Sequence, residues 1–125
     1  MRNINLRRLV GKTSAAGDKD LHMVYAEICA AIQSQHLITF HYSATTDPGY
    51  RTVEPHMIAS SLTGNLTLSA WFLRGASASN EGPGWRQYLL SDISNVTVLP
   101  DTFLGPRFGY KPDGGRTFHN VRCAL

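Results

Sequence analysis

The chain has 125 residues, of which 42% are hydrophobic and 17% charged, and its formal net charge is +3. This length suits one compact domain, and the composition excludes a globally disordered chain and a coiled coil. Charged or small residues interrupt every apolar stretch, so we expect no membrane-spanning segment and no membrane partner.

The positive charge is concentrated at the N-terminus. Four of the twelve basic residues come before the first acidic residue, Asp18, so the rest of the chain is close to neutral. We interpret residues 1–18 as a basic arm and linker. They contain no apolar run of the length that a secretory signal needs, so a cytoplasmic location is the default expectation.

Residues 21–35 are predicted to form a helix. Apolar side chains recur there at steps of three and four residues, and Asp18 or Asp20 is suited to cap the helix start. The residues on this apolar face are Leu21, Val24, Tyr25, Ile28, Ala31 and Ile32. A single apolar face predicts a helix that covers a sheet.

Two strands are predicted after the helix. Apolar and polar residues alternate from Ile38 to Ser43, which is typical of a half-buried strand. The next segment contains Asp-Pro-Gly and indicates a turn, after which a second strand runs from about Tyr50 to Ser60. Pro55 lies inside the second strand and cannot donate to a ladder, so we expect an edge position or a bulge there.

Three more short strands are predicted, at residues 66–74, 85–90 and 95–99. Short strands separated by turn signals favour a mainly β fold of the α+β kind. We expect an N-terminal helix followed by a small five-stranded, strongly bent antiparallel sheet or an SH3/Sm-like barrel. Residues 101–125 are rich in glycine and aromatic residues, and we expect them to pack on the barrel as an irregular C-terminal extension.

The usual catalytic motifs are missing. The chain has no glycine-rich phosphate loop, no GxSxG serine motif and no histidine pair at metal-binding spacing. His41 and His56 could still meet if the first two strands pair. Cys29 and Cys123 lie far apart without CxxC spacing, which favours reduced, buried thiols. We therefore expect no enzymatic activity, no metal and no cofactor.

The segment YRTVEPH, residues 50–56, is the most specific local feature. An arginine four residues ahead of a strand proline, followed by a histidine, resembles the second-strand motif of WYL domains, which are small bacterial ligand-sensing modules. The preceding ITFHY resembles the first strand of that family, and residues 85–99 resemble its last strands. The Trp-Tyr-Leu triplet that names the family aligns with Leu66-Thr67-Leu68, so its tryptophan and its tyrosine are replaced in this chain. The resemblance covers about residues 21–99 and implies a WYL-like domain at 19–100.

The resemblance implies a non-enzymatic regulatory module that binds a nucleotide or a short single-stranded nucleic acid on the bent sheet. Many WYL proteins carry a winged helix-turn-helix, for which the first 20 residues are too short, so we expect a stand-alone sensor. Arginine forks bind phosphate, and aromatic rings stack on bases. The candidate ligand-binding residues are Tyr42, Arg51, His56, Trp71, Arg86 and Tyr88. We expect Arg51 to line an open, hydrated pocket on the concave side of the sheet, with Arg86 nearby.

A second hypothesis is a protein-interaction β-barrel that acts through an edge strand or through dimerisation. The aromatic-rich segment FLGPRFGY, residues 103–110, favours this alternative, because an apolar loop surface can be buried against another subunit. A homodimer is its simplest form, and a regulatory partner protein is another.

Overall fold

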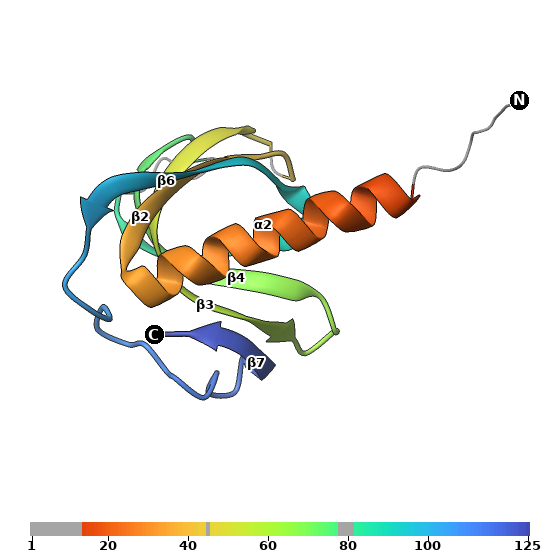
Figure 1. Cartoon of the computed structure of the whole chain (residues 1–125). Helices are drawn as coiled ribbons and strands as arrows, with labels where there is room; N and C mark the ends of the chain where they lie inside the picture. The colour runs from red at the N-terminus through yellow and green to blue at the C-terminus, as the bar shows by residue number, and fades with distance from the viewer. Residues whose placement is uncertain (1–13, 45, 78–81) are drawn as a thin grey trace, which may run out of the picture.

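The computed structural model describes residues 14–44, 46–77 and 82–125. Within them, one α-helix precedes the strands (Figure 1). The elements are α2 (Ser14–Ser34), β2 (His36–Tyr42), β3 (Gly49–Ser61), β4 (Leu66–Gly75), β5 (Gly84–Leu89), the 3-10 turn η1 (Leu90–Asp92), β6 (Ile93–Thr102) and β7 (Phe118–Ala124). The fold is therefore mainly β, as the alternating patterns predict.

The helix begins earlier than its capping signals indicate. α2 starts at Ser14, ahead of the predicted caps Asp18 and Asp20. Ala15 and Ala16 follow Ser14, and alanine has the highest helix propensity, so the helix extends past the acidic residues. Residues 1–13 of the predicted basic arm lie outside the described residues.

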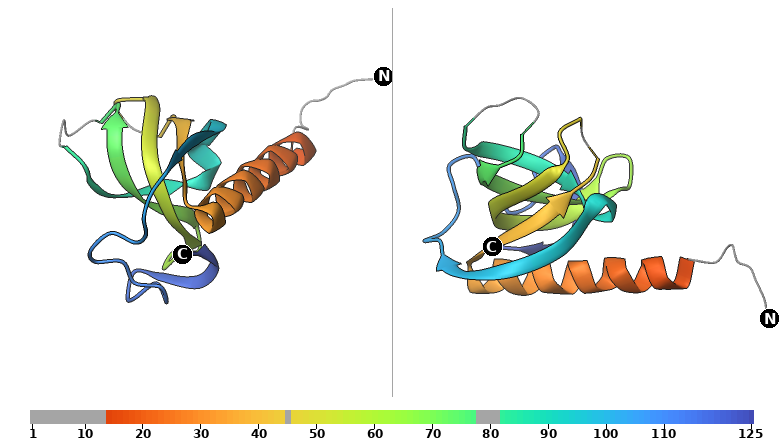
Figure 2. Two further views of the ribbon diagram at one scale, coloured as in Figure 1. Left: turned by 60° about the vertical axis from the view of Figure 1, so that its left-hand side comes forward. Right: turned by 90° about the horizontal axis from the view of Figure 1, so that it is seen from above.

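The described strands form one six-stranded antiparallel sheet in the order β5-β4-β3-β2-β6, with β7 paired to β3. Figure 2 shows that the sheet curves strongly and that α2 runs along one side of it. The end strands β5 and β6 do not pair with each other, so the sheet stays open. The bent antiparallel sheet is thus confirmed over the closed barrel. The C-terminal residues, expected to be irregular, add a sixth strand.

The strand β3 changes partners along its length, and Pro55 lies at the change. β2 pairs with β3 between Gly49 and Val53, whereas β7 pairs with it between Met57 and Ser61. β4 runs along the other edge, and its register shifts between Pro55 and Met57. Because proline has no N–H to donate, an interruption of the hydrogen-bond ladder at this position leaves no proline donor unsatisfied. The predicted irregularity at Pro55 is confirmed.

The core lies between α2 and one face of the sheet. The helix contributes Ile28, Ala31 and Ile32, each at most 1% exposed, whereas the predicted apolar residues nearer its start are only partly buried. The strands contribute Ile38, Phe40, Tyr42, Val53, Ile58, Leu68, Ala70, Phe72, Tyr88 and Ile93. The alternation in β2 and β4 therefore identified the buried face correctly.

A disulfide joins Cys29 on α2 to Cys123 on β7, with the two Cα atoms 5.7 Å apart. The expectation of two reduced thiols is wrong for this structure. Cys123 lies opposite Ile58 in β3, and the side chain of Ile58 belongs to the same core as Cys29. The two cysteines meet only because β7 joins the sheet. Since they are 94 residues apart, no local motif predicts the disulfide.

No helix within the described residues is long and apolar enough to cross a membrane.

Candidate functional site

Four of the six predicted ligand residues lie together on the face of the sheet that α2 covers. Arg51 is opposite Phe40 in β2, and Arg86 is opposite Ala70 in β4. Paired residues of neighbouring strands share a face, and Phe40 and Ala70 both belong to the core. Both arginines therefore lie at the margin of that core. The four residues are Tyr42, Arg51, Arg86 and Tyr88; we call them the arginine–tyrosine cluster.

Arg51 is built into the turn between β2 and β3. Its guanidinium donates to the carbonyl oxygens of Gly49 at 2.8 Å, Asp47 at 2.9 Å and Tyr42 at 3.4 Å. It also lies 5.2 Å from the ring centroid of Tyr42. The residue is only 4% exposed, so the expected open, hydrated position is not what the structure has. The carbonyl groups of the turn replace water around the charge.

Gly75 allows the strands to approach each other beside Arg51. It has a φ of +122°, and a Cβ at this position would lie 2.3 Å from the backbone oxygen of Tyr50 and 2.9 Å from the Cα of Arg51. Any other residue would push β4 away from β3 at this point. The glycine therefore fixes the distance between Arg51 and the next strand.

Arg86 is partly exposed and lies across Phe72. Its guanidinium is 5.2 Å from the centroid of that ring, and it donates to the carbonyl oxygens of Trp85 and Gly82, both at 3.0 Å. Carbonyl oxygens fix the plane of the guanidinium, which matters because a bidentate contact to phosphate requires a defined orientation. Arg86 is thus the more accessible arginine of the cluster.

The two tyrosines connect the arginines to the core. Tyr88 packs edge-to-face on Tyr42 at 4.9 Å and on Phe40 at 5.1 Å. Burial raises the pKa of Tyr88 to about 12, although the positive charges of Arg51 and Arg86 act to lower it. The hydroxyl therefore stays protonated at neutral pH. The hydroxyl of Tyr42 accepts a hydrogen bond from the backbone N–H of Leu89 at 3.0 Å.

The other two predicted residues, His56 and Trp71, belong to a different cluster. Trp71 is opposite Glu54 in β3 and packs edge-to-face on Trp85 at 5.7 Å. The guanidinium of Arg107 lies 5.0 Å from the Trp71 ring and forms two 2.8 Å hydrogen bonds to the Glu54 carboxylate. The structure therefore divides the six predicted residues into a group of four and a group of two.

His56 is fully buried and links β3 to the segment after β6. The backbone N–H of Arg107 donates to its Nε2 at 3.1 Å, so the ring proton resides on Nδ1, which donates to the carbonyl oxygen of Glu54 at 2.9 Å. The ring also stacks on Phe103 with centroids 5.4 Å apart. His41 lies elsewhere, opposite Tyr50. The first two strands do pair, but this pairing does not bring His41 and His56 together.

We expect stability to decrease as the pH falls below about 6.5, the ordinary pKa of histidine. Burial lowers the pKa of His56 in the folded protein, so the unfolded chain takes up the proton first. The stability that depends on neutral His56 is fully present above the pKa of histidine in the unfolded chain. It is lost as the pH falls from that value toward and through the lowered pKa of the folded protein, by no more than about 1.4 kcal/mol per pH unit. Urea unfolding at a series of pH values measures this dependence.

His56→Gln is expected to remove this part of the pH dependence, whereas replacing the exposed His22 in the same way is expected to leave it in place. An unchanged profile in the His56 variant would show that another group is responsible.

Several residues of the second cluster could not be identified from sequence. The segment that follows β6 has no periodicity and contains Phe103, Arg107 and Tyr110, whose positions depend on contacts with His56 and Glu54. The only available signal was the aromatic content of residues 103–110.

Within the described part of the chain, no three His, Cys, Asp or Glu side chains come together as a possible metal site.

Comparisons with known proteins concern the same part of the chain. The WYL domain family profile matches residues 23–98. Among solved structures, the chain is similar to proteasome accessory factor B/C (PafBC) of Arthrobacter aurescens, with a TM-score of 0.55 and 22% sequence identity. The similarity covers 70% of this chain but only 13% of PafBC, so it concerns the fold of a small part of that protein. A search of curated proteins found no significant match.

The arginine–tyrosine cluster, Pro55 in β3 and the strands up to residue 98 all lie within the matched segment, which is more than half of the chain. The chain therefore belongs to the WYL domain family.

Proposed function

We propose that this chain is a non-enzymatic regulatory module that binds a nucleotide or a short single-stranded nucleic acid on its bent sheet. The observation that carries the proposal is the convergence of Arg51 and Arg86 on the rings of Tyr42, Phe72 and Tyr88. Guanidinium groups bind phosphate oxygens. The rings are at most 6% exposed, so they support the guanidinium groups from the core and do not stack on a base. The cluster therefore supplies the phosphate contact that such a ligand needs.

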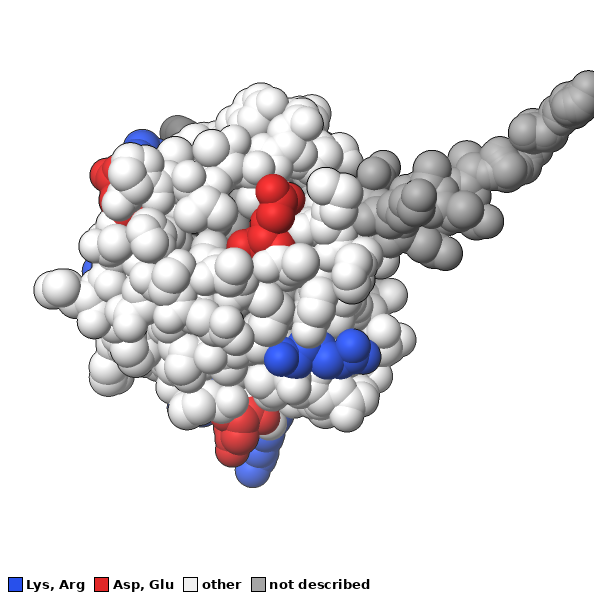
Figure 3. Space-filling model, in the orientation of Figure 1, with Lys and Arg blue, Asp and Glu red and all other residues white. Residues whose placement is uncertain are grey.

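The two arginines have different tasks in this proposal. Arg51 is held by three carbonyl groups and shapes the β2–β3 turn. Arg86 is partly exposed and is the residue that contacts the phosphate. Among the described residues, the face in Figure 3 carries only a few separate charged side chains. Binding that depends on a broad basic surface has less support on this face.

Arg86→Ala tests the proposal. We expect it to weaken binding of a labelled oligothymidylate of about ten nucleotides by about tenfold or more, because a hydrogen bond to a charged group contributes about 1.5–3 kcal/mol. Fluorescence anisotropy measures the Kd, and circular dichroism establishes that the variant is folded. Arg86→Lys is expected to give an intermediate loss, since lysine keeps the charge but not the fork.

Arg74→Ala is the matched control, because Arg74 is exposed near the end of β4 and carries the same charge. We expect it to change the Kd little. Equal losses from Arg74→Ala and Arg86→Ala would indicate unspecific electrostatics and would contradict a site at the cluster. The absence of any binding to oligonucleotides and nucleotides would contradict the ligand class itself.

The proposal keeps the cytoplasm as the location. Reducing systems there keep most thiols free, so at this location we expect the Cys29–Cys123 bridge to be in equilibrium with the reduced thiols. We also keep the division at 1–18, 19–100 and 101–125 into an N-terminal arm, the WYL domain and a C-terminal extension, with α2 already beginning at Ser14 in the arm and β7 lying in the extension.

An interaction module remains the second candidate, because one loop presents two bulky apolar side chains. Leu104 is 104% exposed and Phe108 98% exposed. The loop is held in place: Arg107 binds Glu54, and the indole N–H of Trp85 donates to the carbonyl oxygen of Phe108 at 2.9 Å. A fixed loop with exposed apolar side chains is suited to contact a second copy of the chain.

The oligomeric state tests this alternative. If the loop mediates dimerisation, size-exclusion chromatography with light scattering gives a dimer for the parent chain and a monomer for the Leu104→Ser, Phe108→Ser double variant. A parent chain that is monomeric at all accessible concentrations would eliminate the homodimer.

A further inference from the structure

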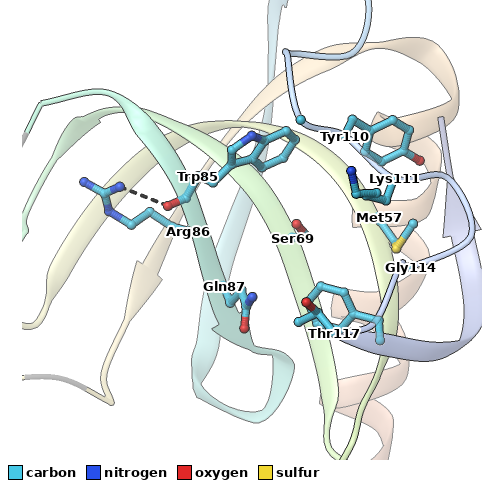
Figure 4. Close-up of a pocket in the computed structure, with 11 residues that line it drawn as sticks. Met57, Ser69, Trp85, Arg86, Gln87, Tyr110, Lys111, Gly114 and Thr117 are labelled. Atoms are coloured by element: carbon cyan, nitrogen blue, oxygen red, sulfur yellow. Dashed lines mark hydrogen bonds between the residues drawn. The ribbon is translucent and has the colours of Figure 1, made fainter.

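A cavity of about 480 Å³ lies on the opposite face of the sheet from the arginine–tyrosine cluster (Figure 4). One wall is formed by β3, β4 and β5, where Ser69 and Gln87 alternate with core residues. The other wall is formed by the C-terminal segment from Gly109 to Phe118. That segment lies beyond the part of the chain that matches the WYL family. The cavity therefore lies between strands inside the family match and a segment outside it.

The C-terminal wall is held by backbone geometry. Gly114 is buried with a φ of +87°, and a Cβ there would lie 2.8 Å from the backbone oxygen of Phe118. Its N–H donates to the carbonyl oxygen of Lys111, while the N–H groups of Thr117 and Phe118 donate to its own carbonyl oxygen. This compact turn places Lys111 and Thr117 on the same wall.

Flat aromatic surfaces dominate the apolar part of the cavity. The rings of Trp85 and Tyr110 are nearly parallel, with an angle of 18° and centroids 6.4 Å apart. The indole N–H of Trp85 already donates to the carbonyl oxygen of Phe108, so the indole offers its ring surface and not its donor. Met57, 2% exposed, adds an apolar contact. A flat ring fits such a lining better than a branched aliphatic group.

The polar part of the cavity favours an anion. Lys111 lies beside Tyr110 in Figure 4. Arg86 also lines the cavity, but its side chain points away from it and donates to the Trp85 carbonyl oxygen. The lining contains no Asp or Glu. Ser69, Gln87 and Thr117 supply hydrogen-bonding groups from both walls. A single cation without a nearby carboxylate suits a ligand with one negative group.

We propose that this cavity binds a small aromatic acid: a flat ring that carries one carboxylate or phosphate group. The ring contacts Trp85 and Tyr110, and the acidic group binds Lys111. Its volume is within the range of small-molecule sites, about 300–1,000 Å³. The site uses the other face of the sheet from the arginine–tyrosine cluster, and Arg86, whose side chain points away from the cavity, borders both.

Isothermal titration calorimetry with four carboxylate-type probes tests the ring and the charge separately. Indole-3-acetate has both features, indole-3-acetamide lacks the charge, cyclohexaneacetate lacks the flat ring, and cyclohexaneacetamide lacks both. Phenyl phosphate tests phosphate as the acidic group. We expect saturable binding of indole-3-acetate, phenyl phosphate or both, and at least about fivefold weaker binding of each probe that lacks a feature. No saturable binding of either acid, or equal binding of cyclohexaneacetate, would overturn the proposal.

Two charge variants locate the acid. Lys111→Met keeps the aliphatic stem and is expected to weaken binding about fivefold or more. Arg116→Met removes an exposed charge from the same segment without touching the cavity, so binding is expected to persist. Equal losses from the two variants would overturn the assignment to this cavity.

Arg86→Ala separates this inference from the proposed function. It is expected to weaken oligonucleotide binding and to leave aromatic-acid binding unchanged. Loss of both activities would show that the two faces do not act as separate sites, and this result would also overturn the inference.

Discussion

Ile28→Asp is expected to unfold the protein or to lower its free energy of unfolding by more than about 4 kcal/mol. Ile28 is 0% exposed and lies in the core between α2 and the sheet. A carboxylate there would be shielded from solvent and surrounded by the apolar side chains of the core. Urea unfolding followed by circular dichroism measures the loss.

Glu27→Ala provides the control one residue away. Glu27 is exposed on α2, and an exposed substitution of this kind changes stability by about 0.5 kcal/mol or less. Similar small losses from both variants would contradict the helical face that the periodicity predicts and the structure contains.

Cys123→Ser is expected to lower the free energy of unfolding by about 4 kcal/mol. The bridge to Cys29 closes a long loop, because the two cysteines are 94 residues apart. In the chain-entropy account, the loss of a cross-link between distant residues releases much conformational freedom in the unfolded chain. Unfolding in the presence and absence of a reducing agent measures the same difference in the parent protein.

The reduced parent protein and the Cys123→Ser variant should unfold at similar urea concentrations, and the reducing agent should not affect the variant. A parent protein whose stability is the same under both conditions would show that the bridge contributes nothing to the native state.

The local pattern of apolar and polar residues was sufficient to predict the helix and most strands of the sheet. The apolar stripe around Ile28 identified the face of α2, and the alternation from Ile38 to Tyr42 identified the buried side of β2. Pro55 marked the interruption in β3 because its effect on a ladder is local and depends only on its missing N–H. These features are encoded within a few neighbouring residues, so the sequence alone revealed them.

Contacts between distant segments could not be predicted in the same way. The pairing of β7 with β3 and the Cys29–Cys123 bridge depend on where the chain returns after a long irregular segment. The ion pair between Glu54 and Arg107 has the same origin. None of these contacts has a spacing signal, because the partners belong to elements that meet only in the folded protein.

The burial of Arg51 illustrates a further limit. An arginine in a strand normally suggests an exposed or ligand-facing side chain, and its motif led us to expect a hydrated position. The turn after β2 instead directs three carbonyl groups at the guanidinium. Sequence identified the arginine, but only the turn geometry shows that its charge is satisfied within the protein.

The most direct test of the central claim is an NMR titration of the isotope-labelled protein with a short oligothymidylate. If the arginine–tyrosine cluster binds the ligand, the resonances that shift are the Arg86 side-chain N–H and the backbone amides of β5 around Tyr88, with smaller changes near Arg51. Shifts confined to the loop with Leu104 and Phe108, or no shifts at all, would contradict a nucleic-acid or nucleotide site on the bent sheet.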